Sequence, residues 1–399
     1  MQTLNPFRVF SRPLNIPFFL IIVLTFFLPL LPYFQMSWER GSNDLMLIAW
    51  QPGRELLTTG VVNTDYPYPV WTVITMLPFA MMEQKTAMIV WLILNLFMVA
   101  ASLALFIRIF DWEVTVGRFI LLSFAFFTYF PMYLSLIIGQ LSVFSLFVLS
   151  LATYLFLHKH WTWLGIALGF SFIKPQVMLL LTCFLLLWAL MQRRRQVLFG
   201  FSGIMAALVL VSLPFISTPR QLIGGGISSH LEAYIEVTTT LWALIMSLGT
   251  SWHIPFLISV LLLLWVGWLW FPFLLGSDIS DNRVRFLISV AVSVNLLVIP
   301  YSWIYNLALL LLPFGYSLSL VLRMTGWQKY VWLTALFIAT HLLAMVIVVI
   351  SKDEININQS QGHHIIHALF LLAMMIYLEY RTNPTGTYLN VKPSLSRQA

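Results

Sequence analysis

Residues 86–107 read TAMIVWLILNLFMVAASLALFI, a run of 22 positions without a charged side chain. A helix of about 20 apolar residues is long enough to cross the hydrocarbon core of a bilayer. Similar runs recur along the 399 residues, of which 60% are hydrophobic and 9% charged. This composition excludes a soluble globular protein and a disordered chain. The 21 basic residues are scattered and form no basic patch, which excludes a nucleic-acid binder. The sequence therefore predicts an all-α polytopic membrane protein.

Twelve apolar runs predict about twelve transmembrane helices. They lie near residues 14–36, 86–107, 119–137, 141–157, 161–173, 177–191, 197–216, 254–275, 286–299, 303–322, 330–350 and 364–380. The first run lacks the short core and small-residue cleavage site of a secretory signal, so it is interpreted as an uncleaved span. A thirteenth candidate, residues 67–82, begins Pro-Tyr-Pro and contains Pro78, which disfavours a continuous crossing helix.

The distribution of basic residues decides the topology, because cytoplasmic loops of membrane proteins carry the excess of Lys and Arg. If residues 67–82 do not cross, fifteen of the 21 basic residues are cytoplasmic and six are outside; if they cross, the ratio reverses. The first arrangement predicts an inner (plasma) membrane protein with both termini in the cytoplasm. It also predicts a helix at the outer interface over 67–82, and two long outer segments, 37–85 and 217–253.

The first outer segment reads SWERGSNDLMLIAWQPGRELLTTGVV over residues 37–62. Its Ser-Asn-Asp cluster is typical of a helix start, and a helix from there would end near Thr58, before Gly60, unless Pro52 breaks it. Asp44 has two interpretations, a helix cap and a general base just above the bilayer. The two are compatible, because a cap position also holds a carboxylate rigidly.

Lys174 follows an apolar run of only 13 residues, 161–173. Such a helix is about 20 Å long, whereas the hydrocarbon core is about 30 Å thick, so Lys174 is expected below the outer surface. Its ammonium either reaches up to the interface or binds an anionic head group such as a lipid phosphate. Gly139-Gln140 opens a span on the neighbouring outer turn, where the pair is either structural or close to Lys174.

The second outer segment contains Arg220, His230 and Trp242, together with Gly224–Gly226. The glycines lack the Lys-Ser/Thr of a phosphate loop and are interpreted as a flexible hinge. Arg220 and His230 either reach an outer cavity or are ordinary interfacial residues. The histidines His363, His364 and His367 are interpreted as a helix end without a metal, and the one cysteine, Cys183, excludes a disulfide framework.

The order of these outer-face residues resembles glycosyltransferase family 87, polyprenyl-phosphate-sugar-dependent enzymes of the GT-C superfamily. The resemblance runs over most of residues 40–320. It is carried by Asp44, Gly60, Tyr66-Pro67-Tyr68-Pro69, Leu77-Pro78-Phe79, Gly139-Gln140-Leu141-Ser142, Gly165…Gly169…Lys174-Pro175 and Thr240-Leu241-Trp242. There is one departure. Where relatives carry a charged or imidazole residue after the Pro-x-x-Trp motif at Pro300–Trp303, this chain has Asn306, which cannot ionise but could hydrogen-bond a sugar.

The resemblance implies a GT-C fold forming one domain over residues 1–399, with interfacial helices in the first outer loop. Residues 1–220 would form the shared module, with outer loop 37–85, followed by variable helices over 221–380 and a cytoplasmic tail over 381–399. The implied activity transfers a sugar from a polyprenyl-phosphate donor to a hydroxyl of a glycolipid or glycan in the cell envelope, on the outer face. Mannose is the commonest sugar in the family, and arabinose or another pentose is the alternative.

The resemblance implies that Asp44 is the catalytic carboxylate and that Lys174 lies near the lipid phosphate. The expected substrate-binding residues are Lys174, Gln140, Tyr68, Arg220, His230, Trp242 and Asn306. One carboxylate acting directly on the acceptor predicts inversion at the anomeric carbon. No cofactor or metal is expected, although the acidic outer loop leaves room for a divalent ion. Two rival classes are a transporter or flippase of lipid-linked sugars, disfavoured by the lack of an internal repeat, and a non-catalytic membrane scaffold.

Overall fold

The computed structural model describes residues 44–113, 115–226, 232, 235, 238–276, 279–343 and 364–382. Every regular element within these ranges is helical, which confirms the predicted all-α class. The predicted first span, 14–36, and the tail beyond residue 382 lie outside the described residues.

Within the described residues, each of the other eleven predicted runs coincides with one or more helices; positions 344–350 of the run 330–350 lie outside them. The longer ones are α5 (Gln84–Ile109), α6 (Val116–Thr128), α7 (Phe130–Ile137), α8 (Ser142–Leu157), α9 (Trp161–Phe170), α10 (Leu179–Met191), α11 (Arg195–Ser212), α14 (His253–Leu274), α15 (Asp281–Val298), α16 (Leu311–Leu322), α17 (Trp327–Phe337) and α19 (Ile365–Thr382). The shorter ones are η2 (Met46–Trp50), α3 (Gln51–Thr59), α4 (Val70–Ala80), η3 (Ser171–Ile173), η4 (Pro175–Val177), η5 (Leu213–Phe215), η6 (Pro219–Leu222), α13 (Leu241–Met246), η7 (Ile304–Leu310) and η8 (Ile338–Leu342).

Five of the helices are long and apolar enough to cross a membrane, namely Gln84–Ile109, Arg195–Phe215, His253–Leu274, Ile304–Leu322 and Ile365–Thr382. A sixth span results if Gly117–Thr128 and Phe130–Ile137, which meet at 66°, cross together. Several other predicted runs form apolar helices of only 10 to 17 residues. The chain is therefore a membrane protein with five or six candidate spans among the described residues, and the count of twelve stays a prediction.

The bend between α6 and α7 has a local cause. Tyr129 between the two helices is extended, with ψ of 111°, and Pro131 is in the first turn of α7. Proline has no N–H to donate to the preceding turn, so it starts a helix more readily than it continues one. A single apolar run thus becomes two helices.

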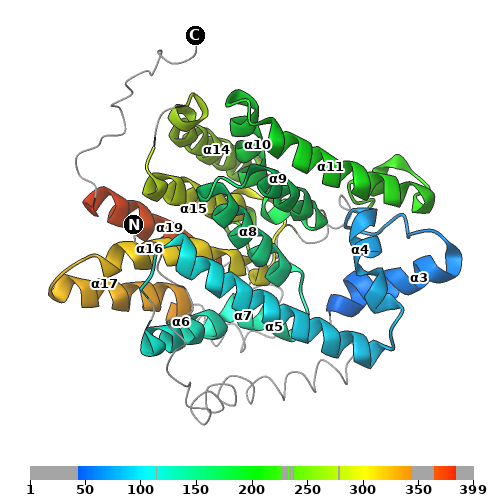
Figure 1. Ribbon diagram of the computed structural model, residues 1–399, viewed down its shortest axis with the longest axis horizontal. Helices are drawn as coiled ribbons and strands as arrows, with labels where there is room; N and C mark the ends of the chain where they lie inside the picture. The colour runs from blue at the N-terminus through cyan, green and yellow to red at the C-terminus, as the bar shows by residue number, and fades with distance from the viewer. Residues whose placement is uncertain are drawn as a thin grey trace.

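The helices α8, α9 and α11 lie side by side, and α5 and α15 flank α8 (Figure 1). The α9–α11 crossing is close because three glycines face it: a Cβ on Gly165 would meet the backbone of Val197, one on Gly169 would meet Ile204, and one on Gly200 would meet the backbone of Thr162. Small residues let helix backbones approach closely inside a membrane. The Gly165…Gly169 motif is therefore a packing motif.

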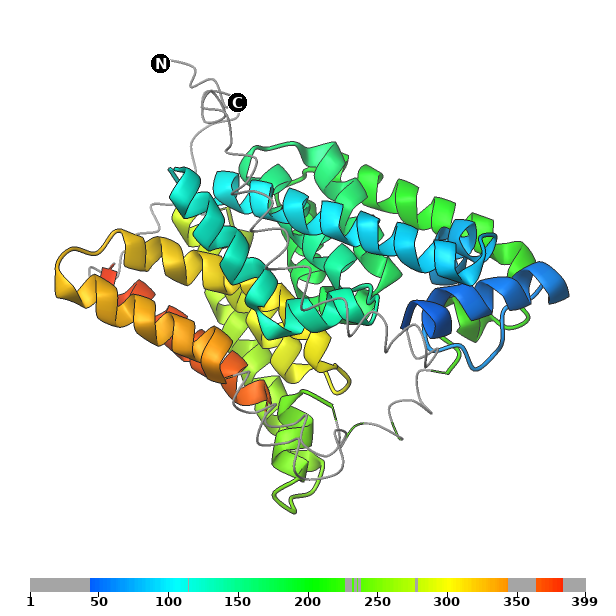
Figure 2. The same ribbon diagram turned by 90° about the horizontal axis from the view of Figure 1, so that it is seen from below.

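The first outer segment forms a small helical layer at one end of the bundle, where α3 and α4 pack against each other beside the start of α5 (Figures 1 and 2). The helix α3 ends at Thr59, and Gly60 caps it with φ of 78°, as the sequence predicts. Pro52 does not break the segment, since it lies in the first turn of α3. The predicted short helix over 67–82 is confirmed as α4, whose position at an interface stays a prediction.

Candidate active site

Asp44 lies at the start of the small helical layer formed by the first outer segment, two residues before η2. Its backbone N–H donates to the carbonyl of Ile138 at 2.8 Å, which ties it to the end of α7. The following residues Leu45, Met46 and Ala49 are buried in the main core, so the segment that carries Asp44 is anchored. The Asp44 carboxylate accepts a hydrogen bond from Gln140. Asp44 thus has a side-chain partner outside its own helix, and its two interpretations, helix cap and general base, both stay predictions.

Gln140 lies in the turn between α7 and α8. Gly139 provides the turn with φ of 70°, a conformation that favours glycine, and its carbonyl accepts from Trp91 Nε1 at 2.8 Å. The Gln140 side chain is 0% exposed, and both ends of its amide are engaged. Its Nε2 donates to Asp44 Oδ2, and its Oε1 accepts from Lys174 Nζ at 3.2 Å.

Lys174 lies in the short turn between η3 and η4. Helix α4 fixes this turn, because Trp71 and Thr72 donate to the carbonyls of Phe172 and Ile173, each at 2.8 Å. The Lys174 side chain is 1% exposed. Its ammonium donates to Gln140 Oε1 and, at 2.9 Å, to Ser142 Oγ. It also lies 4.8 Å from the centroid of the Tyr305 ring, a cation–π contact. The ammonium is thus surrounded by protein groups.

Asn306 belongs to the same hydrogen-bond network. Ser142 Oγ donates to Asn306 Oδ1 at 2.8 Å, and Asn306 Nδ2 donates to Ser302 Oγ at 3.1 Å. Asn306 is 2% exposed and both ends of its amide are engaged. It therefore supports Ser142 from within the protein interior. We call the set Asp44, Gln140, Lys174, Ser142, Asn306 and Ser302 the buried network.

Burial and charge oppose each other within the buried network. Burial raises the pKa of Asp44, while the Gln140 hydrogen bond and the Lys174 charge act to lower it. Burial lowers the pKa of Lys174 to about 7, and the Asp44 charge acts in the opposite direction. Each group thus favours the charged form of the other across the Gln140 amide.

Tyr68 lies beside the network, in the loop before α4. Burial raises its pKa well above the ordinary value, and smaller contributions from Tyr301, Tyr66 and Asp44 act in the same direction. Tyr68 stacks at an angle on Tyr66, with ring centroids 5.8 Å apart. Tyr66 in turn donates to the carbonyl of Ile48 at 2.5 Å, which holds the pair against the Asp44 segment.

The remaining predicted residues are not members of the buried network. Arg220 lies on η6 and is exposed. Trp242 is the second residue of α13, and its Nε1 donates to the carbonyl of Val298 at 2.9 Å. His230 lies outside the described residues. Within the described ranges no group of three or more His, Cys, Asp or Glu side chains is arranged to hold a metal ion.

The glycines Gly224–Gly226 have a packing role that the sequence interpretation missed. A Cβ at any of the three would collide with the backbone of residues 64–67, and Gly226 N–H donates to the Tyr66 carbonyl at 3.1 Å. The interpretation as a flexible hinge is wrong for these residues. They allow the second outer segment to pack closely against the loop that carries Tyr66 and Tyr68.

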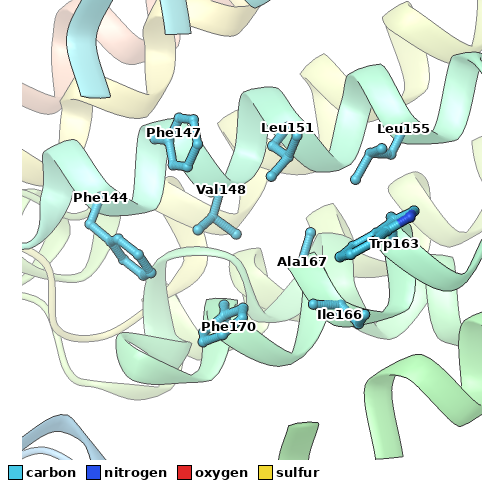
Figure 3. A pocket seen from close by; sticks show the side chains of 9 residues that line it. All are labelled: Phe144, Phe147, Val148, Leu151, Leu155, Trp163, Ile166, Ala167 and Phe170. Atoms are coloured by element: carbon cyan, nitrogen blue, oxygen red, sulfur yellow. The ribbon is translucent and has the colours of Figure 1, made fainter. Parts of the chain in front are cut away.

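An apolar groove of about 400 Å³ runs between α8 and α9 (Figure 3). Phe144 and Phe170 lie at one end of the row of side chains, and Trp163 lies near the other. Phe144 is two residues after Ser142, and Phe170 is four residues before Lys174. One end of the groove is therefore close along the chain to the buried network.

The family model of glycosyltransferase family 87 matches residues 66–300, more than half of the chain. The chain belongs to glycosyltransferase family 87. The activity of the family is glycosyl transfer, which requires a sugar donor and an acceptor. No curated protein and no solved structure matches the chain.

The matched range of this family 87 chain contains Tyr68, Gln140, Ser142 and Lys174, whereas Asp44 precedes it and Asn306 follows it. In the fold, Asp44 is hydrogen-bonded to Gln140 and Asn306 to Ser142, so both lie against residues of the matched range. The sequence patterns had no signal for Ser142, Tyr305 or Ser302 as members of the site. Ser142 stands within a motif of the resemblance, but only its contact with Lys174 distinguishes it from other serines at helix starts.

Proposed function

We propose that this family 87 glycosyltransferase transfers a sugar, in the first instance mannose, from a polyprenyl-phosphate donor to a hydroxyl of a glycolipid or glycan. The reaction takes place on the outer face of the plasma membrane, and Asp44 is the general base. The observation that carries the proposal is the Asp44 carboxylate, held by Gln140, which in turn binds Lys174, within a chain of this family.

In this reaction the acceptor hydroxyl approaches Asp44 Oδ1, since Oδ2 is engaged with Gln140. Asp44 takes the hydroxyl proton while the acceptor oxygen forms a bond to the anomeric carbon. The bond from that carbon to the phosphate oxygen breaks, and its electron pair leaves with the polyprenyl phosphate. A single displacement inverts the anomeric carbon, so a β-linked donor gives an α-linked product. A positioned general base contributes about 10²–10⁴-fold to such a rate.

The leaving phosphate needs a cation that can reach it. Lys174 was expected in this role, but its ammonium is 1% exposed and engaged with Gln140 and Ser142. To contact a phosphate it would have to leave both acceptors. We assign the phosphate instead to Arg220, which lies on η6 and is exposed; His230, expected in the same role from the sequence, lies outside the described residues. Cationic side chains suffice for this role, so the proposal requires no metal.

The apolar groove between α8 and α9 suits the isoprenoid chain of the donor. Its lining is entirely apolar, and its Phe144 end is close along the chain to Ser142. The proposed topology has twelve spans and two cytoplasmic termini. Lys159, Arg193 and Arg194 lie in turns at the opposite ends of α9 and α10 from Lys174, and Arg195 begins α11 there, consistent with a cytoplasmic side that is richer in basic residues.

The test is sugar transfer in vitro from radiolabelled polyprenyl-phosphate mannose to total membrane glycolipid, comparing wild type with Asp44→Asn. We expect label incorporation by wild type and a loss of at least about 10²-fold in the variant, because an amide cannot accept the hydroxyl proton. Asp65→Asn is the matched control, since Asp65 is exposed on the same outer segment.

Full transfer by Asp44→Asn would contradict the assignment of the base. If labelled donor crosses the bilayer of proteoliposomes without any transfer, the protein is a transporter of lipid-linked sugars. If mannose is not transferred, a parallel reaction with a pentose donor shows whether the protein uses a different sugar or transfers none.

A further inference from the structure

The Gln140 amide is oriented by chemistry as well as by geometry. An ammonium can only donate hydrogen bonds, so the amide oxygen must face Lys174. The amide NH₂ then faces Asp44, and an ionised carboxylate can only accept. Each group in the series therefore donates to the next, from the Lys174 ammonium through the Gln140 amide to the Asp44 carboxylate.

We propose that Gln140 and Lys174 form a positioning pair for Asp44: Gln140 holds Oδ2 and leaves Oδ1 to the acceptor, and Lys174 supports the negative charge through Gln140. The inference rests on the proposed function and specifies how its base is kept ready. Gln140 and Lys174 are positioning residues here, and neither contacts the donor or the acceptor.

Burial makes such support necessary. A carboxylate removed from water is disfavoured in its charged form, and a base must be charged to accept a proton. Burial raises the pKa of Asp44, and the Gln140 hydrogen bond, followed by the Lys174 charge, counteracts the rise. Among the described residues, the other titratable groups that interact with Asp44 are Tyr68 and Tyr305, from the loop before α4 and from η7. A phenol is ordinarily neutral in the pH range where a carboxyl titrates.

The far side of the network holds Lys174 in place. Its second hydrogen bond goes to Ser142, which donates to Asn306, which donates to Ser302. Lys174 is thus the first donor of two chains of hydrogen bonds, one towards Asp44 and one towards Ser302. Because each partner is also engaged further along, the ammonium is fixed between Gln140 and Ser142, and the Tyr305 ring covers a third side.

The test is the pH dependence of sugar transfer by Gln140→Glu. This variant keeps the size of the side chain and an acceptor for Lys174, but it removes the NH₂ donor and brings a second carboxyl group against Asp44. We expect the acidic limb of the kcat/KM profile to move to higher pH by about one unit or more, with the rate partly restored at high pH. Gln51→Glu is the matched control, because Gln51 is exposed on the same outer segment, and its limb should not move.

A second readout does not need turnover. The carboxyl stretch of Asp44, identified in infrared spectra as the band that Asp44→Asn removes, should titrate at higher pH in Gln140→Glu than in wild type. A rate that falls equally at every pH, with an unmoved Asp44 band, would overturn the inference and leave Gln140 a structural residue. A raised KM with an unmoved limb would overturn it in favour of direct substrate contact. Failure of the proposed function is distinct, since Asp44→Asn would then transfer sugar as well as wild type.

Discussion

Lys174 illustrates how one side chain can carry charge where water is excluded. Its burial lowers its pKa to about 7, and Asp44 acts against that decrease. A Lys174 ammonium that loses its proton also stops supporting the Asp44 charge. The two groups therefore depend on each other, and a change at either is expected to appear in the titration of both.

We expect Lys174→Met to lower kcat by about tenfold or more near neutral pH and to move the acidic limb of the rate profile upward. The methionine side chain fills much of the same space but carries no charge, so Asp44 loses its Coulombic support, and one pKa unit corresponds to a tenfold change in the ratio of charged to neutral form. Steady-state kinetics with varied donor check this. The donor KM should stay within about twofold of wild type; a large increase would mean that Lys174 contacts the donor phosphate.

At the scale of elements, the two outer segments are held together by backbone contacts. Gly225 lies against the Thr64 carbonyl and Gly226 binds the Tyr66 carbonyl, so the second segment packs on the loop leading to Tyr68. Gln221 strengthens this arrangement by donating to the Val62 carbonyl at 2.6 Å. The position of Tyr68 beside Asp44 thus depends on residues more than 150 positions away in the chain.

We expect Gly225→Ala to reduce sugar transfer by about tenfold or more and to lower the melting temperature of the purified protein, because the added methyl group collides with the Thr64 backbone. Transfer assays and thermal unfolding in detergent measure both effects. Gly203→Ala on α11 is the control, since nothing lies within 4 Å of a Cβ there. Equal behaviour of the two variants would mean that the packing of these glycines has no part in the site.

The α8–α9 groove gives a second prediction at this scale. Leu151→Trp adds bulk to its lining, so we expect a higher donor KM for a long polyprenyl chain and little change for a donor with two isoprene units. Leu94→Trp, on the exposed side of α5, is the matched control. An identical KM change for both chain lengths would exclude the groove as the site of the isoprenoid chain.

Sequence patterns predicted the elements better than the contacts between them. The end of α3 at Gly60 and the apolar helices follow from local rules, because caps and hydrophobic runs act within a few residues. The bend at Tyr129 was not predicted, since the run is continuously apolar. The order of the spans allowed Gln140 to lie close to Lys174, but no sequence pattern joined Asp44 to these two residues. The Asp44–Gln140 contact joins residues 96 positions apart, and the Gln140–Lys174 contact joins residues 34 positions apart. A local sequence pattern carries no information about contacts over such separations.

For the whole molecule, the distribution of basic residues predicts which side of the membrane each loop faces. Cys183 is the one cysteine, so Cys183→Ser gives a background for single-cysteine reporters. In intact cells a membrane-impermeant maleimide should label Asp65→Cys, whereas Lys159→Cys should react only after permeabilisation. Labelling of both without permeabilisation, or the reverse pattern, would contradict the outer position of the site.

The glycine crossing of α9 and α11 limits how the molecule can open. The backbones of α9 and α11 approach each other closely at these glycines, with no side chains between them, so we expect the two helices to move as one rigid body. The groove lies between α9 and α8, and a change in its width must therefore come from α8 and its neighbour α5. On the proposed function, the polyprenyl phosphate would then leave sideways into the bilayer through the motion of the α5–α8 pair, while the α9–α11 pair would stay still and hold the Lys174 turn in place.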